Sequence, residues 1–190
     1  MRATARILIR DGYDALTTNR VAEEAGASVG SLYQYFPSKE ALVAALLQDH
    51  LDSISLQMRQ EVARVATLPV ERAARRFIEL MFELHRVDPE LHRVFAEQLP
   101  RVGDFAKIEA LMDEHVALMQ AYLEAHADEI TPQNHALTAF MLVSTVEALT
   151  HRAVILRPQR HNDAEIVDEI CALVIRYLAP RKPRLVKRAR

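Results

Sequence analysis

Segments compatible with helices fill almost the whole chain, and short breaks at prolines and polar residues separate them. Only four of the 190 residues are glycine, and long stretches are rich in Ala, Leu, Glu and Arg. Runs in which β-branched or aromatic residues alternate with polar ones, the pattern typical of strands, are absent. The sequence therefore predicts an all-α protein, with helices at about residues 2–11, 18–25, 28–35, 38–66, 70–86, 89–98, 103–128, 132–156 and 163–178.

The lengths of these helices predict two domains. Three short helices come first and mostly long ones follow, so we expect a compact unit at residues 1–45 and a larger helical bundle at 46–180. Residues 181–190 hold six Lys or Arg and no acidic residue, which is typical of a frayed basic tail.

The composition favours a soluble cytoplasmic protein. Charged residues interrupt the longest apolar runs, so we expect no segment of the roughly 18 to 20 residues that span a membrane. The start, MRATARILIR, lacks the apolar stretch and cleavage site of a signal peptide. The single cysteine, Cys171, excludes an internal disulfide, and its apolar neighbours in the sequence favour core packing.

Residues 17–42, TTNRVAEEAGASVGSLYQYFPSKEAL, contain two short helical patterns. Thr17 or Thr18 can cap the first helix, and Gly26 can end it in the left-handed conformation. Ser28 can cap the second helix, which is expected to bury its apolar side. An alanine four residues before the turn glycine and a hydrophobe six residues after it indicate a helix-turn-helix. The apolar residues of this pattern are Val21, Ala22, Ala25, Leu32 and Phe36.

The second helix of such a motif enters the major groove of double-stranded DNA. Gly30 and Ser31 are small enough for close approach to the bases. Tyr33 and Tyr35 can donate hydrogen bonds to phosphate oxygens, which requires no net positive charge. Lys39, in the first turn of a helix that Ser38 can cap, can hold a phosphate.

The charge balance and the aromatic residues leave other interpretations of this segment open. Residues 1–50 hold five Lys or Arg against six Asp or Glu, so charge alone does not indicate nucleic-acid binding. The aromatic residues Tyr33, Tyr35 and Phe36 can also be the core of a small bundle. A helical protein-interaction module is a third possibility, and it predicts no salt-dependent DNA binding.

The stretch from Gly12 through TTNRVAEEAGASVGSLYQYFPSKEALVAAL resembles the tetracycline-repressor (TetR) family of bacterial regulators. The resemblance implies an N-terminal three-helix helix-turn-helix head, a larger C-terminal helical bundle for ligand binding and dimerisation, and repression relieved by a small molecule. Family members usually carry an extra turn of the first helix and a basic arm before it, whereas this sequence begins almost inside that helix, with only Arg2, Arg6 and Arg10. The resemblance places Lys39 on the DNA backbone and these residues toward DNA: Thr18, Asn19, Val29, Gly30, Ser31, Tyr33, Gln34 and Tyr35.

The last two long helices are apolar on more than one side. One stripe suffices for a monomer, so the extra apolar surface indicates a homodimer in which two such helices from each chain meet. A dimer supplies a second reading head roughly 34 to 36 Å away, about one turn of DNA, on a palindromic operator. The alternative is a buried hairpin in a monomer. The stripe expected to form the dimer contact comprises Ile166, Ile170, Leu173, Val174 and Tyr177.

Methionine and phenylalanine at inward spacings predict an adaptable apolar cavity, although such stripes also form ordinary cores. The expected effector is a small apolar, ring-bearing molecule among Phe77, Met81, Met112 and Phe140. A polar line on the same helix as Phe140, made of Ser144, Glu147 and His151, either anchors the effector or forms a structural contact, such as a bond between Glu147 and His151. Other inward positions are Leu84, Phe105, Ile108 and Met119.

An enzyme is the remaining alternative, because eight histidines could supply acid–base or metal chemistry. None of them has Glu three residues before it, so the di-iron bundle signature is absent, as is His-Glu-x-x-His. We therefore expect no catalytic residue, no metal and no cofactor.

Overall fold

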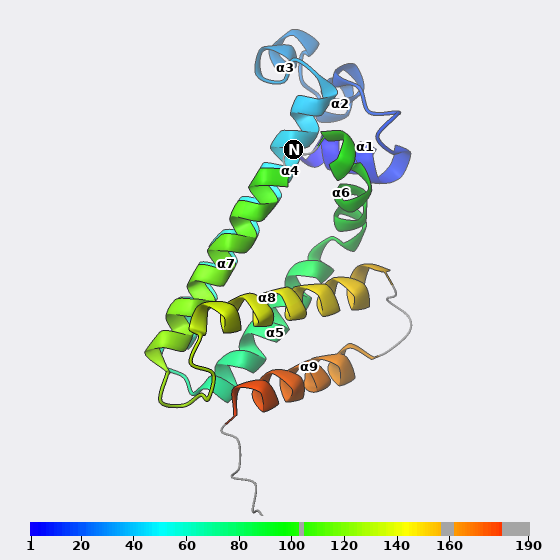
Figure 1. The fold of residues 1–190 in the computed structure, drawn as a ribbon. Coiled ribbons are helices and arrows are strands. Elements are labelled where there is room, and N and C mark those ends of the chain that lie inside the picture. The colour runs from blue at the N-terminus through cyan, green and yellow to red at the C-terminus, as the bar shows by residue number, and fades with distance from the viewer. Residues whose placement is uncertain (103–104, 157–161, 180–190) are drawn as a thin grey trace, which may run out of the picture.

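The computed structural model describes residues 1–102, 105–156 and 162–179, where every regular element is a helix (Figure 1). The all-α prediction is confirmed. The elements are α1 Arg2–Asp11, α2 Thr18–Ala25, α3 Val29–Tyr35, α4 Lys39–Val65, α5 Val70–Val87, α6 Pro89–Val102, α7 Phe105–Ala125, α8 His135–His151, the π-helical turn η1 Arg152–Leu156, and α9 Asp163–Leu178.

Several helix ends differ from their expected positions, among them the end of α7, at Ala125 rather than near residue 128. α6 continues through Pro100 to Val102. A proline inside a helix removes one backbone hydrogen bond, and here the loss of that bond does not end the helix. α8 begins at His135 rather than near residue 132, because the Asn134 side chain caps it by accepting a hydrogen bond from the Leu137 amide at 3.0 Å.

The polar residues at the starts of the short helices act as predicted. Thr17, Ser28 and Ser38 accept hydrogen bonds from the third following amide, at 3.2, 3.1 and 3.2 Å. Gly26 ends α2 at φ 65°, in the left-handed region that a residue without Cβ enters at no steric cost. These local signals fix the turn between α2 and α3.

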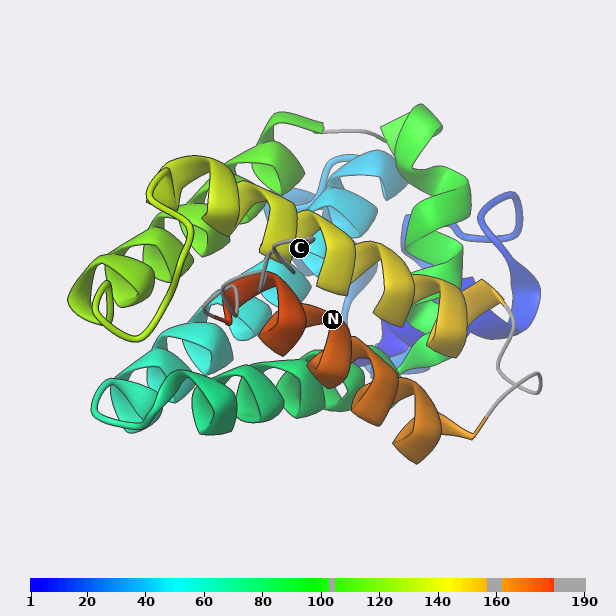
Figure 2. The ribbon, with the colours of Figure 1, turned by 60° about the horizontal axis from the view of Figure 1, so that its bottom comes forward.

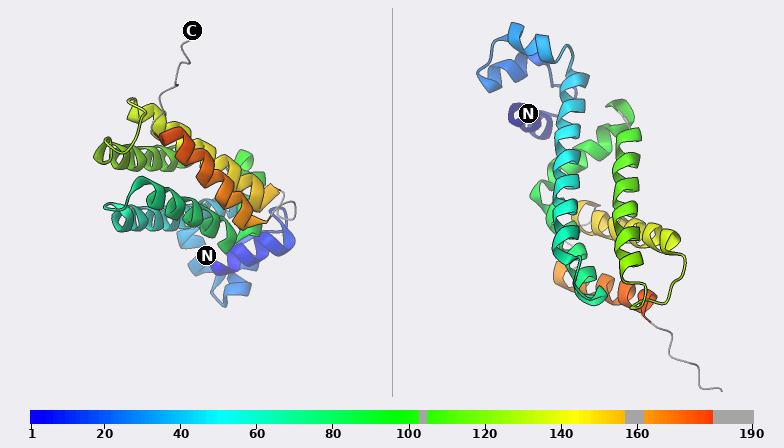
Figure 3. Two further views of the ribbon diagram at one scale, coloured as in Figure 1. Left: turned by 90° about the horizontal axis from the view of Figure 1, so that it is seen from below. Right: turned by 90° about the vertical axis from the view of Figure 1, so that its left-hand side faces the viewer.

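The head is the N-terminal end of the molecule, and its core is continuous with two long helices. Ile7, Leu8 and Leu16 are fully buried together with Leu42 in the second turn of α4. The same cluster includes Leu47 and Leu51 further along α4, and Leu91, Val94 and Phe95 of α6. The head is therefore held by both α4 and α6, and α4 runs from it along the body (Figures 1 and 3).

The body encloses a second core, built mainly from α5, α7, α8 and α9. Figure 2 shows α8 and α9 lying together on one side of the molecule. Cys171 is buried in this core, as predicted.

One sequence expectation about membranes was wrong. The segment His135–Leu156 is long and apolar enough to cross a membrane by length and composition, with a mean hydropathy of 1.4 in its most apolar window. Only two charged residues, Glu147 and Arg152, interrupt it. In this fold the segment packs on α5 and α7, and 33% of that window is buried. Much of its apolar surface is therefore exposed in the single chain.

Candidate DNA-binding surface and ligand cavity

α3 lies at the tip of the head with no buried residue (Figure 1). Tyr35 is 76% exposed, and Val29, Ser31, Tyr33 and Gln34 are exposed as well. A Cβ added at Gly30 would meet nothing within 4 Å, so the start of this helix is open to close approach. The residues that sequence reasoning assigned to α3 thus share one uncovered helix.

The residues assigned to the flanking helices differ in accessibility. Asn19 of α2 is exposed, but Thr18 is only 5% exposed, so the expectation that its side chain faces DNA needs correction. Thr18 follows the cap residue directly and points into the head. Lys39 Nζ donates to the Tyr13 carbonyl at 3.4 Å and lies 4.3 Å from the centre of the Tyr13 ring. Its ammonium group is therefore held at the start of α4.

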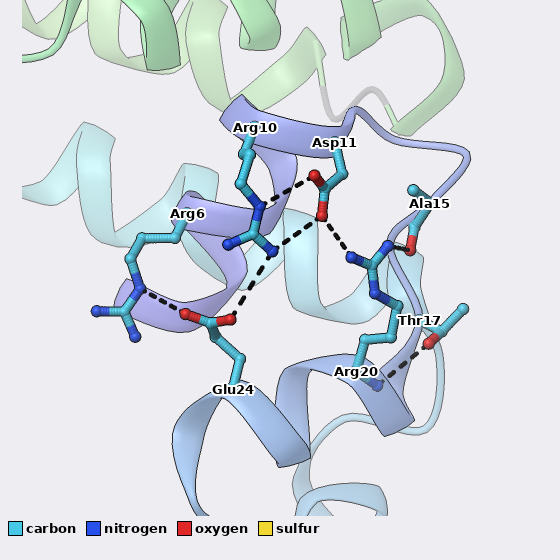
Figure 4. A network of polar contacts seen from close by, with 7 residues as sticks. All are labelled: Arg6, Arg10, Asp11, Ala15, Thr17, Arg20 and Glu24. Atoms are coloured by element: carbon cyan, nitrogen blue, oxygen red, sulfur yellow. Dashed lines mark hydrogen bonds and ion pairs between the residues drawn. The ribbon is translucent and has the colours of Figure 1, made fainter.

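Arginines on α1 and α2 are paired with acidic residues (Figure 4). Arg6 Nε lies 3.0 Å from Glu24, Arg10 lies 2.9 Å from Asp11, and Arg20 also pairs with Asp11. Arg20 donates a further hydrogen bond to the Ala15 carbonyl at 2.8 Å. Exposed pairs of this kind contribute little to stability, but they neutralise cations that could contact phosphates. The head has no basic surplus, and these ion pairs occupy three of its five basic residues.

The letters Gly26-Ala27-Ser28-Val29-Gly30 match the G-x-S-x-G pattern of a hydrolase nucleophile elbow. That elbow requires a strand before the serine, and none precedes it here. The Ser28 hydroxyl instead caps α3 and contacts the Ser31 hydroxyl at 2.9 Å. The match is therefore a feature of the helix-turn-helix.

Two adjoining cavities lie in the body. The smaller, about 70 Å³, has almost wholly apolar walls that include Phe77 and Met81. The larger, about 200 Å³, includes Met112 and His151 in its wall. Three residues line both cavities: Met81, His115 and Glu147. Most of the residues expected to contact an effector are thus brought together, although neither cavity alone reaches the roughly 300 Å³ at the lower end for ligand sites.

The prediction for Phe140 was wrong. Its side chain is 54% exposed and lines neither cavity, and neither does that of Ser144. α8 has apolar residues all round its circumference, so its sequence did not indicate which side faces the body. That side is centred on Ala139, Leu142 and Thr150, and Phe140 lies away from it. The Phe105 side chain lies outside the described residues.

Glu147 has a partner that was not anticipated. Its Oε1 lies 3.3 Å from His85 Nε2 on α5, rather than bonding to His151 one turn away. The pKa of His85 is raised, because the hydrogen bond and charge of Glu147 outweigh the opposing effect of burial. Burial would raise the pKa of Glu147, but His85 lowers it overall. The two side chains form an ion pair in the body.

The expected dimer stripe also needs correction. Ile170 and Val174 are buried within the single chain, and Ile166 packs against the same core, because α9 packs on α5. Val174 also lines the smaller cavity. Only Leu173 and Tyr177 of the predicted set are exposed. Five of the exposed apolar residues of α8 and α9 make up what we call the α8–α9 surface: Leu137, Phe140, Met141, Leu173 and Tyr177.

Within the described ranges, no group of three or more His, Cys, Asp or Glu side chains is arranged to hold a metal ion. The basic tail, residues 181–190, lies outside the described residues.

Family models match most of the chain. Residues 1–46 match the model described as bacterial regulatory proteins, tetR family. Residues 69–178 match the tetracyclin repressor-like C-terminal domain.

Curated relatives include transcriptional regulators and a nucleoid occlusion factor, SlmA. The regulator RutR of Escherichia coli is 31% identical over 123 residues, which cover 60% of this chain and 55% of RutR. The transcriptional activator FasR of Mycolicibacterium smegmatis is 30% identical over 65% of this chain and 59% of its own. The repressor KstR of Rhodococcus jostii is 28% identical over 76% of this chain and 65% of its own. The alignments thus span little more than half of RutR and FasR.

Solved structures share the fold. The fatty acid degradation regulator FadR from Bacillus halodurans superposes with a TM-score of 0.71 at 18% identity, covering 92% of this chain and 91% of that one. The regulator FadR from Bacillus subtilis in complex with stearoyl-CoA gives 0.71 at 17% identity, covering 92% and 95%.

Proposed function

Because the chain belongs to the tetracycline-repressor family of bacterial regulatory proteins, we propose that it binds a palindromic operator as a homodimer and represses transcription until a small, largely apolar effector releases it. The observation that carries this proposal is α3, which is held at the tip of the head with Ser31, Tyr33 and Gln34 exposed. Relatives include both an activator and a repressor. Expression of a reporter gene behind the operator, measured with and without this protein, determines whether the protein represses or activates transcription.

The division of labour follows from this proposal. Residues 1–45 read DNA and residues 46–180 bind the effector and form the dimer through the α8–α9 surface. The tail at 181–190 adds affinity at low salt without reading bases, because its six cations release counterions from DNA of any sequence. The site of action is the cytoplasm, where the operator is found.

DNA contacts should separate into two classes. Tyr33→Phe and Lys39→Ala should weaken binding to every duplex by a similar factor, because a hydroxyl and an ammonium at phosphates carry no sequence information. Ser31→Ala and Gln34→Ala should instead change the preferred bases, at about 1 to 3 kcal/mol per affected base pair. Fluorescence anisotropy with the operator and with single-base variants measures both effects.

The control for these variants is Leu56→Ala, since Leu56 is exposed on α4 in the body. It should bind DNA as the unmodified protein does. If Gln34→Ala lowers affinity equally for all duplexes, α3 does not read bases and the proposed role of this helix is wrong.

The larger cavity is placed to influence the head. Its wall includes His50 and Leu51 of α4, and His92 and Phe95 of α6. Both helices share the core of the head, and α6 also contacts α1. An effector that prefers one arrangement of α4 and α6 shifts the spacing of the two heads, and coupling of about 5- to 150-fold in operator affinity is the usual range.

Met112, in the wall of the larger cavity, should govern the effector response. Met112→Ala changes the shape of the cavity without touching the head, so it should blunt release by effectors while affinity for free operator stays near that of the unmodified protein. The measurement is operator release against a compound library, with Leu56→Ala as control. If Met112→Ala loses the dimer or unfolds, Met112 is core, and the effector site lies elsewhere.

A further inference from the structure

Five of the eight histidines line the larger cavity, and each comes from a different helix. His50 lies on α4, His85 on α5 and His92 on α6, while His115 lies on α7 and His151 on α8. Glu147 is the one acidic residue in the same wall. The remainder of the wall is apolar. Such a cluster is unusual for a core and needs a chemical explanation.

The hydrogen bonds of His85 determine where one proton lies. Its Nδ1 lies 2.8 Å from the Met81 carbonyl, which can only accept, so Nδ1 carries a proton. Its Nε2 faces the Glu147 carboxylate at 3.3 Å. A neutral imidazole with a proton on Nδ1 has only a lone pair at Nε2, so a second proton must lie between His85 and Glu147. The carboxylate is thus already neutralised by His85.

The neighbouring pair is neutral. His92 Nδ1 lies 3.2 Å from the Asp88 carbonyl and so donates to it. His92 Nε2 is therefore the acceptor for His50 Nε2, which lies 3.1 Å away. Burial lowers the pKa of His50 to about 4, and it also lowers the pKa of His92. Both rings are therefore uncharged near neutral pH.

His115 is the histidine in this wall with a buried ring nitrogen that lacks a hydrogen bond. Its side chain is 5% exposed, and its Nε2 is buried without a hydrogen-bond partner. Buried polar atoms in folded proteins are nearly always paired, and unpaired ones call for an explanation. His115 lies where the two cavities adjoin, so a ligand occupying either cavity meets this ring. A polar atom of a bound molecule would supply the missing partner.

The charged and titratable side chains of the cavity wall indicate which class of ligand can bind. Apart from the His85–Glu147 pair, the wall offers imidazoles that can each gain a proton, and no unpaired carboxylate. An anionic group favours the protonated form of an adjacent imidazole, whereas a cation disfavours it. The smaller cavity beside His115 is almost wholly apolar. The site therefore suits a molecule with an acidic end and an apolar body.

We propose that the effector is an organic acid whose apolar body enters the smaller cavity and whose carboxylate binds His115, which takes up a proton on binding. This inference rests on the proposed function, since it names the class of effector for the same regulator. The charged or titratable groups that face the cluster from the surrounding helices are Asp49, His50, His85, Asp88, His92, Glu114, Glu147 and His151.

The sign of the pH dependence follows from the change in charge. Burial lowers the pKa of free His115 below its ordinary value, so the ring is neutral near pH 7. A bound carboxylate raises this pKa, so the bound state holds one more proton than the free state. Affinity is then highest at low pH and falls as the pH rises through the pKa of the complex. The limit for one proton is about tenfold per pH unit.

Titration calorimetry with the full chain tests this proposal. The probes are octanoate, dodecanoate and phenylbutyrate, each with its methyl ester, and octylamine as a cationic counterpart. At least one acid should bind more tightly than its ester, and its affinity should fall by about tenfold or more between about pH 6 and pH 8. Buffers that differ in heat of ionisation should report uptake of close to one proton. The acids are ionised throughout this range, so the proton comes to the protein.

A variant identifies the residue that gains the proton. His115→Gln keeps a hydrogen-bond donor but cannot become charged, so it should remove proton uptake and weaken acid binding about tenfold or more at pH 6. The matched control is His126→Gln, a buried histidine outside both cavities, which should change neither. If His115→Gln fails to fold, the comparison of acid with ester in the unmodified protein still tests the proposal.

The proposal is overturned if no acid binds more tightly than its ester, if octylamine binds best, or if acid binding takes up no proton. Operator binding is measured on the same samples. If the operator is bound while acids are not preferred, the effector class is wrong and the DNA-binding proposal stands. If an acid binds with proton uptake but no operator is bound, the regulatory proposal is the one that fails.

Discussion

Phe140→Glu is expected to convert the protein to a monomer and to lower operator affinity by at least about 100-fold. Phe140 is 54% exposed in the single chain and lies on the α8–α9 surface. Two carboxylates in an apolar contact between subunits would be buried without partners, which is strongly unfavourable. Separate heads then bind half-sites independently and lose the roughly 10²- to 10⁴-fold gain that linked binding provides.

Analytical ultracentrifugation gives the oligomeric state and a gel shift gives the affinity. Leu56→Glu is the matched control, because Leu56 is 57% exposed on α4 and does not belong to the α8–α9 surface. That variant should remain a dimer with unaltered operator affinity. A Phe140→Glu protein that remains a dimer would show that subunits meet through another surface.

Leu42→Ala is expected to lower the free energy of unfolding by about 2 to 5 kcal/mol, the range for a fully buried leucine. Leu42 is 0% exposed and belongs to the cluster that joins α1, α2 and α4. Since domains of this kind are stable by only about 5 to 15 kcal/mol, the head should open at lower denaturant than the body.

Urea unfolding followed by circular dichroism measures this loss, and proteolysis locates it in the head. The dimer should persist, because the α8–α9 surface is untouched, while operator binding is lost. Leu56→Ala removes an exposed leucine from the same helix and should stay within about 0.5 kcal/mol of the unmodified protein. A loss below about 1 kcal/mol for Leu42→Ala would mean that the head does not depend on this core.

Local signals in the sequence were sufficient to predict the head. Ser28 and Ser38 cap the helices that they were expected to cap, and Gly26 adopts the left-handed turn. Each of these features depends on residues within a few positions of one another, where the chemistry of a cap or a turn is decided. The resemblance to a known family then supplied the role of the exposed α3, which periodicity alone could not give.

Long-range packing could not be predicted in the same way. α8 has apolar residues all round its circumference, so its own sequence did not indicate that Phe140 faces outward while Leu142 faces the body. Glu147 and His85 are 62 positions apart, and no local pattern joins them. The histidine cluster is assembled from five helices, each of which supplies one ring. Only the tertiary fold makes these residues neighbours.

Selection of duplexes from a random DNA pool, followed by the mass of the complex with the selected duplex, tests the central proposal most directly. A dimeric helix-turn-helix regulator should enrich an inverted repeat whose half-site centres lie about 10 base pairs apart, or a multiple of that spacing. Each duplex in the complex should carry two protein chains or a multiple of two. Failure to enrich any sequence over the starting pool, or enrichment of one unrepeated half-site bound by a single chain, would contradict the proposal that this protein reads a palindromic operator as a dimer.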